Sequence, residues 1–150
     1  MGARLGIIKG ISVAGGTAFN RVELAPAANR PVKIHQVSIT LDGPPNSSVV
    51  GTQFDLQRMS TVGTGTPATI KPVREEDATA LQSTGLVNNT ADGTTADLLH
   101  GWFVPVIGGL IIPFDPDERP DCSPGNFMGV QNVAALDGSR KAATYMVFEE

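Results

Sequence analysis

Residues 31–41 read PVKIHQVSITL and decide the fold class. Alternating apolar residues of this stretch share one face of an extended strand before His35, and share the opposite face after Gln36. The two sets are Val32 and Ile34, and Val37, Ile39 and Leu41. A change of parity inside one strand predicts either a β-bulge or a strand that passes from one sheet to another.

The same period of two recurs along the rest of the chain, and glycine-containing turns separate the segments. The clearest hairpin is predicted for Trp102–Ile107 and Leu110–Phe114 around Gly108-Gly109. The only helical candidate is Glu75–Gln82. Further strands are predicted around 5–13, 22–24 and 53–57, and over Thr69–Val73, Leu81–Asn88, Asn126–Val133 and Ala143–Phe148. We therefore predict one all-β domain over residues 1–150, a jelly-roll-like antiparallel β-sandwich of roughly eight to ten short strands with little helix.

Composition narrows the classes of partner. The net charge of −4 comes without any run of Lys and Arg among aromatic residues, which argues against nucleic acid as a ligand. The first ten residues lack the features of a signal peptide, and no apolar stretch approaches the length of a membrane helix, so we expect no membrane partner. The polar segments Asn46–Gly51, Val62–Pro67 and Asn88–Asp97 are predicted to be loops.

Cys122 is the only cysteine, and a thiolate needs a nearby base to act as a nucleophile at neutral pH. His35 and His100 are the candidate bases. Cys122 stands between two prolines and beside Asp121, however, which favours a turn cysteine whose negative neighbour raises the thiol pKa. Both histidines are interpreted as structural.

Three further segments resemble functional sites in composition. The acidic segment Asp115–Asp121 offers oxygen ligands for calcium but lacks EF-hand spacing, so we favour a solvated loop. The Gly63–Pro67 segment lacks the Gly-Lys-Ser/Thr of a phosphate loop and is predicted to be an ordinary loop. Glu75, Glu76 and Asp77 are adjacent, so they cannot all face one hydrolytic pocket, and we expect a solvated helix start.

Sugar binding is a further hypothesis, because Trp102 and Tyr145 are candidates to stack on a sugar ring. The chain has only 5% aromatic residues, which leaves few for a binding platform. The sequences at Asn46–Ser48 and Asn88–Thr90 satisfy the glycosylation rule, but without a signal peptide we interpret both as chance matches.

Two predicted strands carry apolar residues on both parities. In Leu98–Val106 and Ala143–Phe148 a single core does not account for all of them, so we expect part of this surface to lie between subunits. The candidate interface residues are Trp102, Phe103, Tyr145 and Phe148. We expect a homo-oligomer, with a trimer favoured.

Two stretches resemble a known family. They are 56–73 (LQRMSTVGTGTPATIKPV), which leads into residues 77–82, and the closing strand 143–150 (ATYMVFEE). The order of these elements is similar to that in the head decoration, or cement, proteins of tailed bacteriophages. The order is a strand ending in Arg, a Gly/Thr segment, a Thr-x-x-Pro-Val strand and a final strand closing on two glutamates.

That resemblance implies a jelly-roll-like sandwich, often trimeric, that is made in the host cytoplasm and sits on the outer surface of the virion, where it clamps neighbouring major capsid subunits. It carries over no binding residue. We identify no catalytic residue, cofactor or metal site and expect no enzymatic activity. The alternatives are a carbohydrate- or receptor-binding sandwich of a phage fibre or spike, and a small cupin-like enzyme, for which the two isolated histidines are too few ligands.

Overall fold

The computed structural model describes residues 4–12, 19–42, 51–77, 81–105, 108–136 and 140–150. These residues form twelve β-strands and one short 3₁₀ helix, η1. The strands are β1 (Leu5–Ile11), β2 (Asn20–Ala25), β3 (Val32–Asp42), β4 (Gly51–Met59), β5 (Thr64–Pro67), β6 (Lys71–Pro72), β7 (Thr84–Ala91), β8 (Thr95–Pro105), β9 (Gly108–Pro113), β10 (Asp121–Cys122), β11 (Phe127–Asn132) and β12 (Lys141–Glu149); η1 spans Glu75–Asp77.

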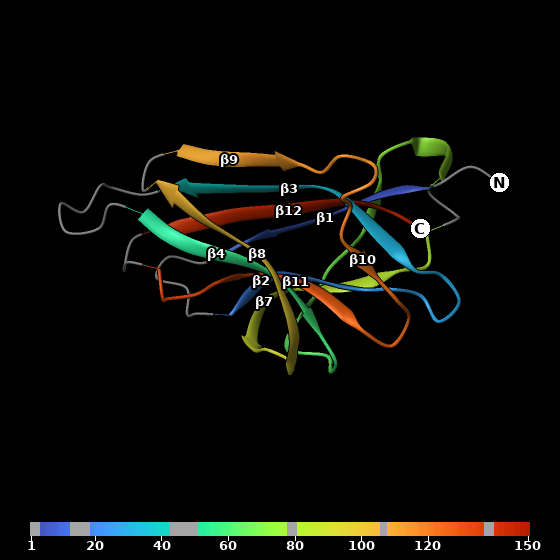
Figure 1. Ribbon diagram of the computed structural model, residues 1–150, viewed down its shortest axis with the longest axis horizontal. Helices are drawn as coiled ribbons and strands as arrows, with labels where there is room; N and C mark the ends of the chain where they lie inside the picture. Colours follow the sequence, from blue (N-terminus) through green and yellow to red (C-terminus); the bar gives the residue numbers. More distant parts are fainter. Residues whose placement is uncertain (1–3, 13–18, 43–50, 78–80, 106–107, 137–139) are drawn as a thin grey trace.

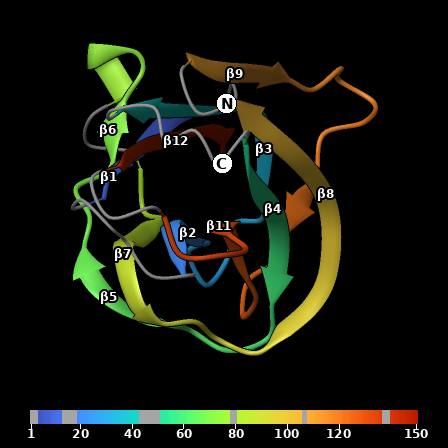
Figure 2. The ribbon, with the colours of Figure 1, turned by 90° about the vertical axis from the view of Figure 1, so that its left-hand side faces the viewer.

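The strands form two antiparallel six-stranded sheets that pack as a sandwich (Figure 1). Sheet A has the order β10-β3-β12-β1-β6, and β9 pairs with the same edge of β3 as β10. Sheet B has the order β5-β7-β2-β11-β4-β8. The end-on view shows the two layers, with β8 curving along one side of the sandwich (Figure 2). The predicted all-β sandwich is confirmed.

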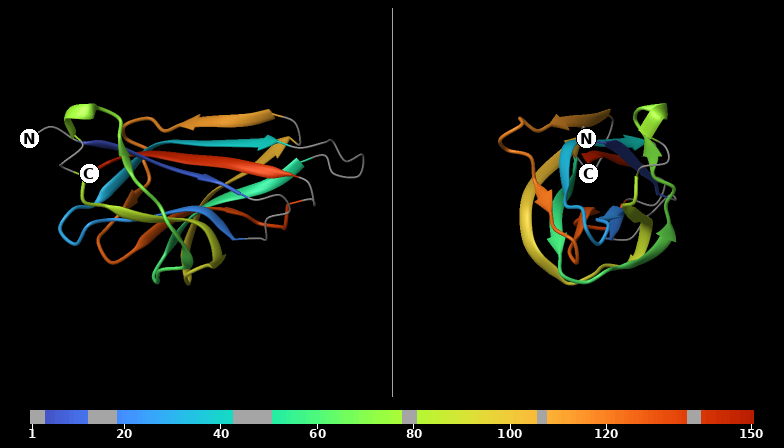
Figure 3. Two further views of the ribbon diagram at one scale, coloured as in Figure 1. Left: turned by 180° about the vertical axis from the view of Figure 1, so that it is seen from behind. Right: turned by 90° about the vertical axis from the view of Figure 1, so that its right-hand side faces the viewer.

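The main strand pairs are nested along the sequence. Strand β1 pairs with β12, β2 with β11, β3 with β9, and β4 with β8. The chain thus behaves as one long double strand rolled into two sheets, which is the arrangement of a jelly roll. Of the four remaining strands, β10 pairs with β3, and β5, β6 and β7 extend both sheets on the side opposite β8 and β9 (Figure 3).

Of the two alternatives predicted for residues 31–41, a β-bulge or a strand that changes sheet, the structure has the bulge. In the pairing of β12 with β3, Val147 lies opposite Gln36 and Phe148 lies opposite Ile34, so His35 is the extra residue. Because of the bulge, the apolar side chains that precede His35 in the sequence and those that follow it point to the same face of the sheet. Val32, Ile34, Val37, Ile39 and Leu41 are all buried in the core.

The core lies between the two sheets and takes alternate residues from the strands of both. Phe54 of β4 and Phe148 of β12 are its fully buried aromatic side chains. Phe148 packs directly over the backbone of β1 at Gly6. A Cβ atom added to Gly6 would lie 2.6 Å from the Phe148 ring, so the ring needs a glycine at this position. The apolar residues that recur at every second position of the sequence are therefore the residues that pack in the core.

The predicted hairpin between Trp102–Ile107 and Leu110–Phe114 is wrong. Strand β8 pairs with β4 in sheet B, whereas β9 pairs with β3 in sheet A. The chain changes sheet between them, and Gly108, at a φ of 126°, begins β9. The apolar residues on both strands looked like a hairpin because two strands in different layers of one core have the same patterning as paired strands.

Several predicted boundaries also need correction. The segment expected to be a loop at Val62–Pro67 contains strand β5, which pairs with β7. The loop expected at Asn88–Asp97 is much shorter, because β7 continues to Ala91 and β8 begins at Thr95. Only Lys71–Pro72 of Thr69–Val73 is a strand. The helix expected over Glu75–Gln82 is reduced to η1 in its first three residues, and residues 78–80 lie outside the described ranges.

Candidate functional site

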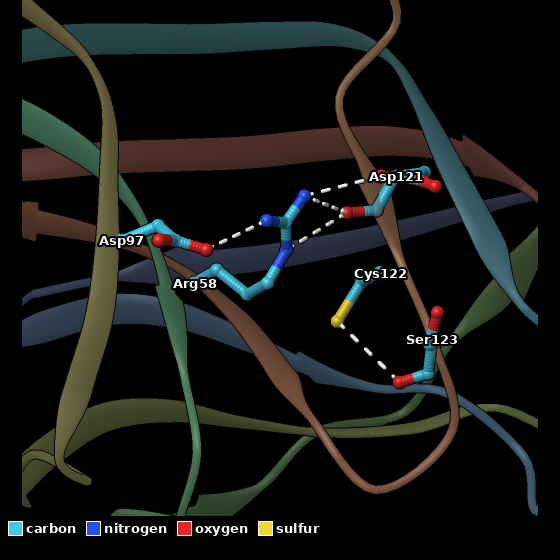
Figure 4. A network of polar contacts seen from close by, with 5 residues as sticks. All are labelled: Arg58, Asp97, Asp121, Cys122 and Ser123. Carbon is cyan, nitrogen blue, oxygen red and sulfur yellow. Dashed lines mark hydrogen bonds and ion pairs between the residues drawn. The ribbon is translucent and has the colours of Figure 1, made fainter.

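Cys122 lies at the end of the short strand β10, with its side chain fully buried in the core. Burial raises the pKa of the Cys122 thiol to about 11; nearby Arg58 opposes the shift and Asp121 adds to it. Its thiol contacts the carbonyl oxygen of Ser123 at 3.9 Å (Figure 4). This is the environment of an inert structural thiol.

The polar group beside Cys122 joins the two sheets. Arg58 of β4 donates to the Asp121 carbonyl oxygen from Nη2 at 2.7 Å and from Nε at 3.2 Å. The same guanidinium pairs with the Asp121 carboxylate at 3.1 Å and with Asp97 of β8 at 2.8 Å (Figure 4). All three guanidinium nitrogens make structural contacts, so this arrangement fastens β10 to sheet B.

We expect the Cys122 thiol to resist labelling by thiol reagents in the folded protein. With a pKa of about 11, only about one thiol in a thousand is ionised at pH 8, and the side chain is shielded from solvent. Labelling with a disulfide reagent at pH 8 should be slow until denaturant unfolds the chain. Labelling as fast as that of a free thiol, before unfolding, would contradict this structural role. Cys122→Ser is expected to leave function intact.

The two histidines lie in other structural contacts. His35 Nε2 lies 2.7 Å from a carboxylate oxygen of Glu149, and Arg119 Nη1 is 3.6 Å from the same oxygen. His100 stacks on Trp102 at a centroid distance of 5.7 Å and lies 5.4 Å from Phe114. No hydrogen bond joins Cys122 to either histidine within the part of the chain that the structure describes.

The acidic segment Asp115–Asp121 does not converge on one point. Asp115, Asp117 and Glu118 are exposed, whereas Asp121 is drawn to Arg58. Over the described ranges, no group of three or more His, Cys, Asp or Glu side chains is placed to hold a metal ion. Glu75 and Glu76, in η1, are also exposed.

A buried carboxylate that the sequence analysis missed lies on β2. Glu23 is almost fully buried and accepts hydrogen bonds from Gly63 N at 2.9 Å, Asn89 Nδ2 at 2.6 Å and Asn20 Nδ2 at 3.4 Å. A Cβ atom at Gly63 would lie 2.7 Å from the Glu23 carboxylate, so only glycine permits this approach. The Gly63–Pro67 segment therefore binds a carboxylate of its own chain.

A second missed contact involves Glu150. Its carboxylate accepts hydrogen bonds from Gln82 N at 2.7 Å, Ser83 N at 2.9 Å and the Ser83 hydroxyl at 2.5 Å, and pairs with Arg30 at 3.4 Å. Burial by itself would raise the pKa of Glu150, but these donors outweigh burial and lower it. The contact ties the end of β12 to the segment that precedes β7.

Replacing Glu150 with glutamine should therefore destabilise the fold in a pH-dependent way. A carboxylate with a lowered pKa stabilises the fold above its ordinary pKa of 4.5, and this contribution is lost as the pH falls through the folded value. We expect Glu150→Gln to reduce the free energy of unfolding by about 1–3 kcal/mol at pH 7 and by much less near pH 3. Urea unfolding at both pH values measures the difference. An equal loss at both would contradict the role of the charge.

The four candidate interface residues do not form one surface. Phe148 is 0% exposed inside the core, so it is unavailable to a partner and the interface prediction is wrong for this residue. Tyr145 lies on the outer face of sheet A, and its hydroxyl accepts a hydrogen bond from Gln36. Trp102 is half-buried in an aromatic cluster with His100 and Phe114, and the two residues proposed for sugar stacking, Trp102 and Tyr145, are not brought together.

Among the described residues, Phe103 is the most exposed of the large apolar side chains, at 75%. It lies on the outer side of β8, paired with Gln53 of β4, and forms one wall of a hollow of about 520 Å³. The other lining residues are Gly51, Thr52, Gln53, Val133, Ala134 and Ala135. Leu98 of the same strand and Val133 are also exposed. We call Leu98, Phe103 and Val133 the β8 patch.

Of the two glycosylation sequences, Asn46–Ser48 falls outside the described residues. Asn88 lies in β7, and its side-chain amide donates to the carbonyl oxygen of Ile11.

No helix in the described part of the chain has the length and apolar character needed to cross a membrane.

No protein-family model and no curated protein matches the chain. Among solved structures, it is similar to a chain of the acid-stable capsid of Helicobacter pylori bacteriophage KHP30, with a TM-score of 0.38 and 12% identity, over 97% of this chain and 87% of that one. It is also similar to a chain of T=1 particles derived from infectious bursal virus, with a TM-score of 0.21 and 15% identity, over 98% of this chain and 40% of that one. At these TM-scores, the fold assignment rests on the strand pairings.

Proposed function

We propose that this chain is a structural virion protein that binds the outer surface of an icosahedral phage head and stabilises the contacts between major capsid subunits. The observation that carries the proposal is the β8 patch, an exposed apolar surface with an adjoining hollow on a sandwich built for rigidity. Such a surface allows copies of the chain to associate into a clamp on the lattice. The resemblance of residues 56–73 and 143–150 to cement proteins supplies the class of partner.

The β8 patch also supports self-association, and a homotrimer is the assembly we propose. Among the residues that the structure describes, strand β8 is paired with β4 alone, so its other edge has no strand partner there. Its one charged side chain, Asp97, is neutralised by Arg58. Copies of a chain with a net charge of −4 can therefore meet here without strong repulsion. Light scattering of the free protein should give about three times the chain mass of 15.7 kDa. If the trimer forms only on the lattice, the free protein should have the mass of a single chain and trimers should be found only on heads.

The mechanism is mass action. A protein that binds only the assembled lattice stabilises that lattice by about 2.7 kcal/mol at a hundredfold excess over its Kd. A trimer gains further, because its second and third contacts form at high effective concentration once the first is made. Shape, exposed apolar surface and charge are sufficient for this role.

The test compares particles produced with and without the chain. Heads that carry it should withstand higher temperature before releasing their DNA, and purified protein added to heads that lack it should restore that resistance. Equal heat resistance, together with no binding on addition, would refute the cement function and favour a receptor-binding module.

A further inference from the structure

The outer face of sheet A carries all four lysines of the chain. They are Lys9 on β1, Lys33 on β3, Lys71 on β6 and Lys141 on β12. Lys9, Lys33 and Lys141 alternate with buried residues of their strands, and Lys71 is paired with the outward residue Ile7, so all four point away from the core. All four are exposed, and none of their side-chain ammonium groups makes an ion pair or hydrogen bond with another residue that the structure describes.

The centre of this face is apolar and aromatic. Ile7 lies opposite Val147, and Tyr145 lies opposite Lys9. Ile11, on the same side of β1, is 54% exposed. The ladder rows through these residues contain no carboxylate across β6, β1, β12, β3 and β9. An apolar centre with charged residues around it is the usual composition of a protein–protein interface.

Within the described strand ladders of sheet A, carboxylates occur only towards the two ends of the face; the exposed Glu75 and Glu76 of η1 lie beside β6. Asp42 lies opposite Lys141, and Glu149 and Asp121 both lie opposite Lys33. Glu149 is already bound by His35 and Arg119, and Asp121 by Arg58. Lys9 and Lys71 have no acidic partner in the strand ladder. The positive charge of the face is thus least opposed at Lys9, along β1.

We propose that the outer face of sheet A is the docking surface for a folded protein that presents Asp and Glu side chains around an apolar patch. The inference rests on the proposed function, in which this partner is the capsid lattice. The concentration of lysines on one face of an acidic chain orients the molecule, because an acidic partner attracts this face and repels the rest.

A protein partner fits this face better than nucleic acid. Four lysines spread over a flat sheet provide few phosphate contacts, and the net charge of −4 opposes the approach of a polyanion. The apolar centre at Ile7, Tyr145 and Val147 needs an apolar counterpart, which a phosphate backbone does not offer. The β8 patch lies on the other sheet and stays available for self-association.

The experiment compares two variants of equal charge. One replaces all four lysines with glutamine, which takes the net charge from −4 to −8 by removing four positive charges. The control also reaches −8, by adding a carboxylate at four exposed neutral positions away from the lysine face. These control substitutions are Ala28→Glu, Thr66→Glu, Thr84→Glu and Ala91→Glu. Circular dichroism and melting temperature establish that both variants fold.

Binding is measured to heads that lack the chain and, separately, to immobilised poly-glutamate, at low and high salt. The lysine variant should bind both at least about tenfold more weakly than the control, and raising the salt should reduce the difference. Equal binding of heads by the two variants, with wild-type protein bound, overturns the docking face while the proposed function stands.

The other outcomes are equally decisive. If wild-type protein and control bind poly-glutamate in a lysine-dependent way but neither binds heads, the acidic-protein surface is supported and the capsid function fails. If neither probe distinguishes the variants, the docking face is refuted. Stronger lysine-dependent binding to a DNA oligonucleotide or to anionic vesicles than to poly-glutamate would refute a protein partner.

Discussion

Replacing Phe148 with alanine is expected to lower the free energy of unfolding by about 3–5 kcal/mol, because it leaves a cavity in the centre of the core. The ring is 0% exposed and packs against the backbone of Gly6, where the strand has little freedom to fill the space. Urea unfolding of purified protein measures the loss, which should not depend on protein concentration.

Phe103→Ala is the matched control, because it removes the same ring from the surface. It should change the stability of the monomer by less than about 0.5 kcal/mol and should weaken self-association. A Phe148→Ala protein as stable as wild type, with lost self-association, would return Phe148 to the interface and contradict the sandwich described above.

Replacing Glu23 with alanine is expected to cost about 3 kcal/mol or more. Three buried donors, from Gly63, Asn89 and Asn20, would lose their acceptor, and each buried donor left unpaired costs about 1–3 kcal/mol. The loss should be concentrated where β5 meets β7, because Gly63 directly precedes β5 and Asn89 lies in β7.

Hydrogen exchange of the Gly63 amide is the local measurement. It should exchange much faster in Glu23→Ala than in wild type, and Glu23→Gln, which keeps one acceptor oxygen, should lie between them. Unchanged exchange at Gly63 with an unchanged urea midpoint would show that the carboxylate does not hold this segment.

Local patterns predicted the strands but not their partners. The parity change at His35 predicted the bulge, because a buried face must remain continuous and an extra residue is the means of keeping it so. The same reasoning failed for β8 and β9. Alternation shows that two segments are extended and half-buried, and it does not show whether they share a sheet.

Some properties of the candidate site residues could likewise be predicted from local sequence, and others depended on the tertiary fold. Residue type and neighbours were enough to predict Cys122 as an unreactive thiol, and burial does raise its pKa. Phe148 and Tyr145 looked equivalent in the sequence, yet they lie in the core and on the outer face of sheet A. Apart from the local Asn20–Glu23 bond, the Glu23 and Glu150 contacts join residues at least 40 positions apart, and the sequence carries no local signal for such pairs.

Electron microscopy of heads assembled with and without the chain tests the central claim most directly. The proposal predicts additional density on the outer capsid surface, with the shape of this sandwich, sheet A facing the capsid subunits and copies meeting at the β8 patch. Density for this sandwich on a tail fibre or spike, or heads that are identical with and without the chain, would contradict it.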